Sequence, residues 1–125
     1  MDILEAILWL TLNIYHEARG DGEMSQLAVA HVTLNRAEQG NRTVKETVLA
    51  PAQFSWTLLE KKRWIPDDTD AFLQCLHSAG VAARGYDFTG GATHYHLVTI
   101  NPWWADDMLF VGQFGSHRLY KEDKP

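Results

Sequence analysis

The spacing of apolar residues near the N-terminus is the feature that most restricts the fold of this chain. Between Ile3 and Ala18, apolar side chains recur every three or four positions, which is the period of an amphipathic α-helix. Asp2 stands where an N-cap is expected, and Gly20 stands where a helix commonly stops. We therefore predict a first helix that places Glu17 in its last turn.

Three further helices are predicted before the pattern changes. The segment 22–39 keeps the helical spacing and is closed by Gly40. The segment 43–46 matches a capping box, which predicts a short helix that ends at Pro51. Asp67 and Asp68 offer N-caps for a fourth helix that ends near residue 85. Its expected buried face consists of Phe72, Leu73, Leu76 and Ala79.

The last third of the chain has a different period. Polar and apolar residues alternate over 93–99, and the segments 108–113 and 117–121 flank a turn that contains Gly115. Alternation with a glycine turn indicates short antiparallel strands. The chain is therefore predicted to be one α+β domain over residues 1–125, mostly helical with a small antiparallel β-region. A cleft is expected where the two parts meet.

Composition excludes several classes of function. A formal net charge of -5 gives no general attraction to polyphosphate, so we expect no nucleic-acid partner. Cys75 is the single cysteine, which excludes an internal disulfide and is compatible with a reducing compartment. The apolar N-terminal segment contains Asp2 and Glu5 and lacks a basic region, so we predict neither a signal peptide nor a stable membrane association.

Glu17 is the strongest candidate for a catalytic group. The negative end of the helix dipole disfavours an added negative charge in the last turn, and partial burial acts in the same direction. Both effects raise the pKa of the carboxyl group, which can then donate a proton near neutral pH. Arg19 projects from another side of the helix and need not ionise it. The alternative is a solvated or paired glutamate, for which Arg36 is an available partner.

Four segments, in order, resemble one known family. They are IYHEARGDGEMSQLAVAHVTLNRA at 14–37, AQFSW at 52–56, GATHYH at 91–96, and PWW followed by FVGQFGSHRLY at 102–120. Together they resemble the SleB-type cell-wall hydrolases, the family of spore-cortex-lytic enzymes and phage endolysins. The resemblance implies a lysozyme-like fold, similar to that of lytic transglycosylases, and it implies that Glu17 is the catalytic acid.

The same resemblance implies a substrate and a reaction. The expected substrate is the glycan strand of peptidoglycan, cut at the β-1,4 bond between N-acetylmuramic acid and N-acetylglucosamine with a 1,6-anhydro end. Glu17 would act first as acid and then as base, with no metal and no cofactor. Hydrolysis as in a muramidase would instead pair two carboxyl groups about 5 to 9.5 Å apart. The possible partners are Asp21, Glu23, Asp87, Asp106 and Asp107, and we interpret Asp21 as an N-cap of the second helix.

Further residues are predicted to contact the substrate: Gln26, Phe54, Ser55, Trp56, His94, Tyr95 and His96. The aromatic segment could stack against sugar rings, although Trp56 is equally well interpreted as core. Tyr95 is the preferred contact on its strand, because its neighbours His94 and His96 face the other side. His117 and Tyr120 are expected to brace the hairpin by hydrogen bonds.

Two other functions fit parts of the sequence. His94, His96 and His117, with Cys75 or His77, could bind zinc for amide cleavage as in a peptidoglycan amidase. The pair His16–Glu17 lacks the second histidine of the H-E-x-x-H motif, however. A noncatalytic wall-binding module would explain the aromatic residues and leave the EARG segment without a role.

The resemblance also suggests a setting. We expect a monomeric phage endolysin that is made in the host bacterial cytoplasm without a signal peptide. It would reach the periplasmic cell wall after a holin opens the membrane.

Overall fold

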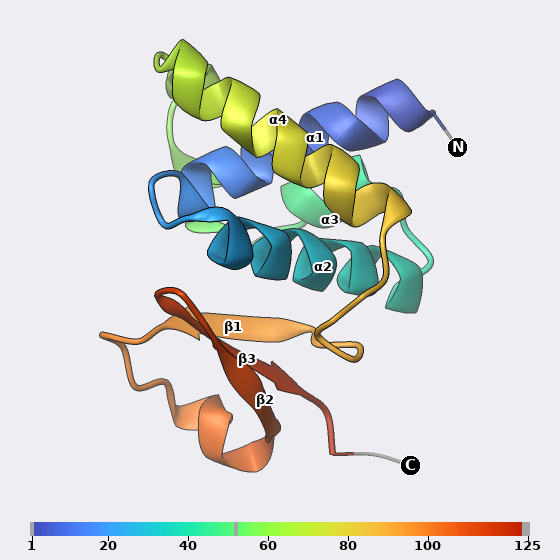
Figure 1. Ribbon diagram of the computed structural model, residues 1–125, viewed down its shortest axis with the longest axis vertical. Coiled ribbons are helices and arrows are strands. Elements are labelled where there is room, and N and C mark those ends of the chain that lie inside the picture. Colours follow the sequence, from blue (N-terminus) through green and yellow to red (C-terminus); the bar gives the residue numbers. More distant parts are fainter. Residues whose placement is uncertain (1, 52, 124–125) are drawn as a thin grey trace.

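The computed structural model describes residues 2–51 and 53–123, in which four α-helices lie above a three-stranded antiparallel sheet (Figure 1). The helices are α1 (Ile3–Ala18), α2 (Glu23–Gln39), α3 (Val44–Leu49) and α4 (Thr69–Arg84). The strands are β1 (His94–Leu97), β2 (Leu109–Phe114) and β3 (His117–Lys121). Short 3₁₀ helices occupy Ser55–Leu58, Lys61–Trp64 and Trp103–Asp107. This arrangement confirms the predicted α+β class.

Local capping explains where three of the helices begin. The Asp2 carboxylate accepts a hydrogen bond from the backbone of residue 5 at 3.0 Å, and Asp68 does the same for residue 71 at 3.0 Å. Thr43 and Glu46 form the predicted capping box with bonds of 3.0 and 2.9 Å. These caps satisfy backbone donors that the first turn of a helix leaves unpaired.

The predicted cap of α2 is wrong. Gly22 is the N-cap residue, with a φ of 87°, and it makes no side-chain capping bond. The Asp21 carboxylate instead accepts a hydrogen bond from the Ser116 hydroxyl at 3.0 Å. Asp21 therefore ties the start of α2 to the turn between β2 and β3.

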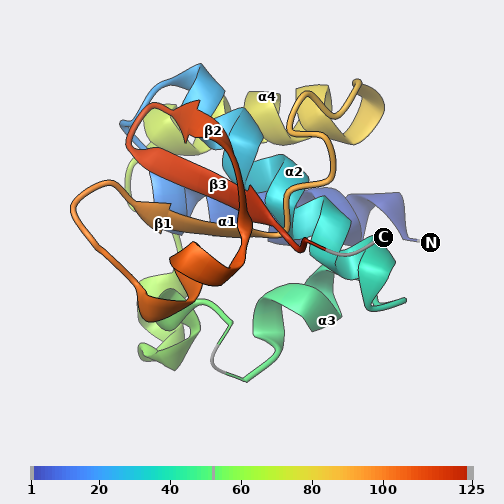
Figure 2. The same cartoon turned by 90° about the horizontal axis from the view of Figure 1, so that it is seen from below.

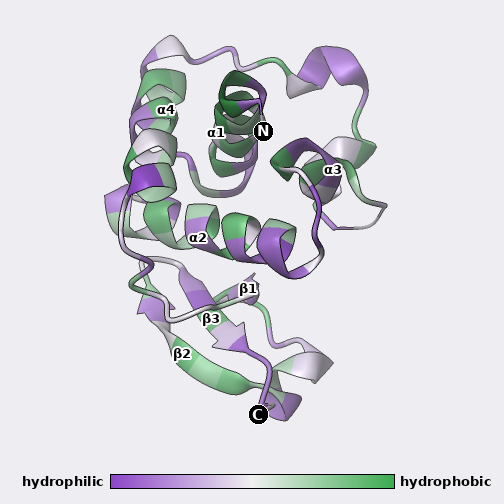
Figure 3. Ribbon diagram, turned by 90° about the vertical axis from the view of Figure 1, so that its right-hand side faces the viewer, coloured by the Kyte–Doolittle hydropathy of each residue, from purple (hydrophilic) through white to green (hydrophobic). Residues whose placement is uncertain are grey.

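Helix α2 is the centre of the molecule, because it lies between the other helices and the sheet (Figures 1 and 3). Val29 and Ala30 belong to the core shared with α1 and α4. Ala28 and Val32 belong to a second, smaller core with Leu119 of the sheet. Helix α2 is consequently buried on two sides, which holds the helical layer and the sheet in one fixed arrangement.

The buried face of α4 differs from the prediction. Leu73 and Leu76 are 54% and 37% exposed, whereas the buried residues are Cys75, Ser78, Ala79 and Ala82. Helix α4 packs on both α1 and α2, and small side chains at this spacing allow the close approach. The expectation for Ala79 is confirmed, and Phe72 is partly buried against the same core.

The sheet has the order β1-β3-β2, with antiparallel pairing throughout. Its turn contains Gly115 at a φ of 60°, where an added Cβ would lie 2.9 Å from the Cβ of Ser25. The hairpin turn is therefore packed directly against the first turn of α2. Seen from below, the segment 53–64 and α3 lie on the β1 side of the sheet (Figure 2). Within the described residues, no helix has the length and apolar character needed to cross a bilayer.

Candidate active site

Glu17 lines a pocket of about 400 Å³ at the meeting point of the helices and the sheet. Its walls come from the end of α1, the last turn of α2, the segment 53–58 and strand β1. The other residues that line it are Arg36, Gln53, Phe54, Ser55, Leu58 and Tyr95. The cleft expected between the two parts of the fold is therefore present, and Glu17 lies in it.

The Glu17 carboxyl group has one direct side-chain partner in this pocket. The Tyr95 hydroxyl donates a hydrogen bond to Glu17 Oε1 at 2.5 Å. Burial raises the pKa of Glu17, while the hydrogen bond from Tyr95 and the positive charge of Arg36 act against that rise. Burial has the largest effect, so the net shift is upward. The raised pKa agrees with the sequence prediction and favours a protonated group.

Tyr95 remains neutral in this environment. Burial is the main cause that raises its pKa well above that of a free tyrosine, and the nearby charge of Glu17 adds to the rise. The phenol therefore keeps its proton and stabilises the ionised form of Glu17 as a hydrogen-bond donor. The predicted role of Tyr95 as a substrate contact is untested, but its position beside the carboxyl group gives it a second role.

Side chains from α2 and β3 hold the end of α1 in place. His117 donates a hydrogen bond to the backbone carbonyl of Glu17, and its Nδ1 lies 2.6 Å from the Ser25 hydroxyl. Since the other ring nitrogen is the donor, Nδ1 accepts from Ser25. Burial lowers the pKa of His117, which keeps the ring neutral. The carbonyls that a helix C-terminus leaves unpaired are thus used to fix the backbone under Glu17.

The prediction that Gln26 faces the cleft is wrong. Its side chain has no exposed surface, because its amide nitrogen donates to the Ala18 carbonyl at 3.5 Å and its oxygen accepts from Ser78 at 2.8 Å. Gln26 therefore supports the end of α1 from beneath and is not placed to touch a substrate.

The aromatic segment divides into two parts. Phe54 and Ser55 line the Glu17 pocket, and their contact with a substrate stays a prediction. The Arg36 guanidinium lies 5.3 Å from the Phe54 ring centre. Trp56 is buried, stacks on His16 with ring centres 4.4 Å apart, and donates its indole N–H to the Asn13 side chain at 2.9 Å. The core interpretation of Trp56 is confirmed, and its predicted contact with sugar is not supported.

The two histidines of β1 lie outside the Glu17 pocket. His94 lines a neighbouring pocket of about 320 Å³. His96 lines a third pocket, and its ring stacks on Tyr120 with centres 5.3 Å apart. The alternation along β1 explains this separation from Tyr95. His96 is thus not brought to the candidate acid, and its Nε2 lies 2.9 Å from the hydroxyl of Tyr120, one of the bracing residues expected in the hairpin.

Sequence reasoning did not single out Gln53 and Leu58 as part of this site. Gln53 belongs to the AQFSW segment, and the resemblance of that segment to the family could have indicated that Gln53 lies in the site. Leu58 is an exposed apolar residue of the first 3₁₀ helix. A leucine alone does not indicate a place in an active site. Arg36, considered only as a structural partner of Glu17, is a wall of the pocket.

Three of the five candidate second carboxyl groups lie at other places in the fold. Asp21 accepts a hydrogen bond from Ser116. Asp87, in the loop before β1, accepts hydrogen bonds from Thr89 of the same loop and from Asn35 of α2. Asp106 lines the pocket of His96. Among the described residues that line the Glu17 pocket, Glu17 is the only carboxylic acid.

The histidines and the cysteine of the zinc hypothesis do not converge. Cys75 lies in the core of α1, α2 and α4, and His117 points to the end of α1. In the described part of the chain, no three His, Cys, Asp or Glu side chains are grouped so that they could hold a metal ion.

Replacing Tyr95 with phenylalanine should raise the pKa of Glu17, because the substitution removes a hydrogen bond that favours the ionised carboxylate. The alkaline limb of the pH profile of kcat/KM should therefore move to higher pH. A pH profile of wall lysis by the purified variant measures this shift. A limb that moves to lower pH, or does not move, would contradict the assignment of Glu17 as the titrating acid.

The chain is similar to known cell-wall enzymes in sequence and in structure. A family model described as Cell Wall Hydrolase matches residues 20–120, a range that begins just after Glu17. The structure is similar to the catalytic domain of the germination-specific lytic transglycosylase SleB from Bacillus anthracis, with a TM-score of 0.76 and 25% identity over 93% of each chain. It is also similar to the catalytic domain of the Bacillus cereus SleB protein, with a TM-score of 0.75 and 25% identity over 94% of this chain and 91% of that one. No curated protein sequence matched.

Proposed function

This chain belongs to the cell wall hydrolase family, and from that membership we propose that it cleaves the glycan strands of peptidoglycan as a lytic transglycosylase. The bond cut is the β-1,4 bond between N-acetylmuramic acid and N-acetylglucosamine. The similarity to two SleB catalytic domains, one of them described as a lytic transglycosylase, supports the proposal. The lysozyme-like fold shared with those domains brings Glu17 into a pocket, as this reaction requires.

One observation carries the choice of reaction. Glu17 is the only carboxylic acid among the described residues that line its pocket, and burial raises its pKa. Two-carboxylate hydrolysis places a second acid about 5 to 9.5 Å away to activate water or to attack the sugar. Transglycosylation needs a single group that donates a proton and later accepts one. The pocket therefore fits transglycosylation better.

The reaction can be written with the residues present. Protonated Glu17 gives its proton to the glycosidic oxygen as the bond from that oxygen to C1 of the muramyl residue breaks. The 2-acetamido group of the muramyl residue stabilises the developing positive charge. The 6-hydroxyl oxygen of the same sugar then bonds to C1, and its proton goes to the Glu17 carboxylate. Glu17 is restored, and no water is consumed.

Tyr95 and Arg36 stabilise the ionised carboxylate of Glu17 that exists between the two proton transfers. After the first proton transfer the carboxylate is ionised in a buried site, where an unpaired charge is costly. The hydroxyl of Tyr95 and the charge of Arg36 both favour this ionised form. Their balance against burial keeps the group able to give and to take a proton in the same turnover.

Analysis of the products tests the proposal. Purified peptidoglycan is digested with the protein, and the released muropeptides are examined by mass spectrometry. The expected products carry 1,6-anhydromuramyl ends, which are lighter by one water than reducing ends. Reducing muramyl ends would show hydrolysis instead, and freed stem peptides with intact glycan would show an amidase.

We also propose that the protein serves as a phage endolysin in the host cytoplasm and acts after the membrane is opened. Burial raises the pKa of the Cys75 thiol to about 11, which makes this lone cysteine unreactive and is compatible with a reducing compartment. The protein, expressed in the bacterial cytoplasm, should lyse cells only when a holin is co-expressed. Lysis at the same rate without a holin would overturn this setting.

A further inference from the structure

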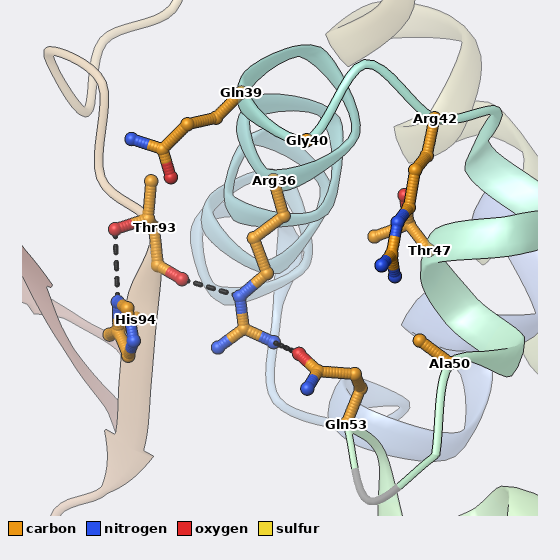
Figure 4. A pocket seen from close by; sticks show the side chains of 9 residues that line it. All are labelled: Arg36, Gln39, Gly40, Arg42, Thr47, Ala50, Gln53, Thr93 and His94. Atoms are coloured by element: carbon orange, nitrogen blue, oxygen red, sulfur yellow. Dashed lines mark hydrogen bonds between the residues drawn. The ribbon is translucent and has the colours of Figure 1, made fainter.

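A second pocket adjoins the candidate active site. It has a volume of about 320 Å³ and lies between the end of α2, helix α3 and the start of β1 (Figure 4). Arg36 and Gln53 line both this pocket and the Glu17 pocket. The two pockets therefore share a wall, and a molecule bound at Glu17 lies beside the second pocket.

The lining of this pocket is positively charged although the whole chain has a net charge of -5. It contains Arg36 and Arg42 and, among the described lining residues, no carboxylate. Nε of Arg36 donates to the Thr93 carbonyl at 2.5 Å, and Nη1 donates to Gln53 at 3.4 Å. Because a guanidinium carries five N–H donors, Arg36 is held in place and still has donors for a ligand.

Arg42 is an exposed arginine on the opposite wall (Figure 4). The charge of Arg42 acts on Glu46, whose carboxylate accepts the backbone N–H of Thr43 in the capping box. Glu46 does not line the pocket. The guanidinium of Arg42 is thus available to an anion that enters from the side of Glu17.

The C-terminus of α2 does not oppose such an anion. Unpaired carbonyls at a helix end would repel negative charge. Here the carbonyls of residues 36, 37 and 38 accept the backbone N–H groups of residues 40, 42 and 41, at 2.9, 2.9 and 3.1 Å. Among the described residues that line the pocket, the permanently charged side chains are the two arginines.

We propose that this pocket binds a carboxylate of the peptide stem carried by the muramyl residue whose bond is cut at Glu17. The inference rests on the proposed function, because the stem is attached to the same sugar that must lie beside Glu17. Arginine is suited to carboxylates, and the side-chain amides of Gln39 and Gln53 suit the peptide groups of the stem. The pocket makes the enzyme selective for glycan that still carries its peptides.

Two variants test this subsite without touching the Glu17 pocket. Arg42→Gln removes one guanidinium, and Gln39→Glu adds a carboxylate of similar size to the same wall. Arg84→Gln is the matched control, since Arg84 lies in the last turn of α4, lines neither pocket, and changes the net charge equally. Thermal unfolding of each variant verifies that the fold is kept.

The measurement is KM on two soluble glycan substrates. One carries its stems, and the other has been treated with an amidase, which leaves a lactyl carboxylate in place of the peptide. Arg42→Gln and Gln39→Glu should raise KM about tenfold on the first substrate and leave it unchanged on the second. Arg84→Gln should change neither value.

The outcomes separate this inference from the proposed function. Equal KM changes on both substrates would assign the pocket to the lactyl carboxylate and overturn the stem assignment. Unchanged KM on both would also overturn it, with glycan cleavage left intact. If the unmodified protein cleaved neither substrate, the proposed function itself would be wrong.

Discussion

Glu17→Gln is expected to lower the rate of glycan cleavage by about 100- to 10,000-fold, because glutamine cannot donate the proton that the leaving oxygen needs. The amide keeps the shape of the side chain and can still accept the hydrogen bond from Tyr95. The rate of anhydro-end formation on purified peptidoglycan measures the loss. Substrate binding should be largely retained, so that kcat falls much more than KM rises.

Glu23→Gln is the matched control for this substitution. Glu23 is exposed at the start of α2 and does not line the Glu17 pocket. It should leave the rate of cleavage unchanged. Full lysis by Glu17→Gln would contradict the assignment of Glu17 as the acid.

The stability of Glu17→Gln should stay within about 1 kcal/mol of the unmodified protein. Burial raises the pKa of Glu17 in the folded state. The folded protein therefore binds more protons than the unfolded chain, and stability falls as the pH rises from the ordinary glutamate range through the raised pKa. Glutamine does not titrate, so the variant does not lose stability in this way. Any difference in the free energy of unfolding at neutral pH should therefore favour the variant. Denaturant unfolding at two pH values measures the sign.

Trp56→Ala is expected to lower the free energy of unfolding by about 3 to 5 kcal/mol. The substitution empties a buried site in which the indole stacks on His16 and meets Trp64 edge to face at 5.5 Å. It also leaves the Asn13 side-chain oxygen without the indole N–H, and an unsatisfied buried acceptor adds to the cost. Urea unfolding measures the change.

Trp103→Ala provides the comparison, because Trp103 is 83% exposed. Its effect on stability should stay within about 0.5 kcal/mol. If both tryptophan variants had equal stability, and Trp56→Ala only raised KM, Trp56 would be a sugar-binding platform and its assignment to the core would be wrong.

The helices were predictable because their signals are local. The Asp2 cap, the capping box at Thr43 and the glycine after each long helix act within a few residues, so the sequence order alone shows where they operate. The buried face of α4 was not predictable in this way. Large apolar residues were assigned to the core, whereas close packing on two other helices selects the small residues Cys75, Ala79 and Ala82.

The site was predictable in part for the same reason. Glu17 could be found from its segment and its place at a helix end, but its partners come from distant parts of the chain. Tyr95 is 78 residues away from Glu17, and His117 is 92 residues away from Ser25. No local pattern indicates that Gln26 turns inward to hold the Ala18 carbonyl or that His96 turns toward Tyr120.

The dependence of the end of α1 on β1 and β3 has a consequence for biosynthesis. A growing polypeptide emerges from the ribosome with its N-terminal helices first, and these can form before the hairpin exists. At that stage the Glu17 carboxyl group would lack the Tyr95 phenol, and the Glu17 backbone carbonyl would lack the His117 imidazole. The complete surroundings of Glu17 therefore form only after residues 95 and 117 have been synthesised, and a product released before them would lack this site.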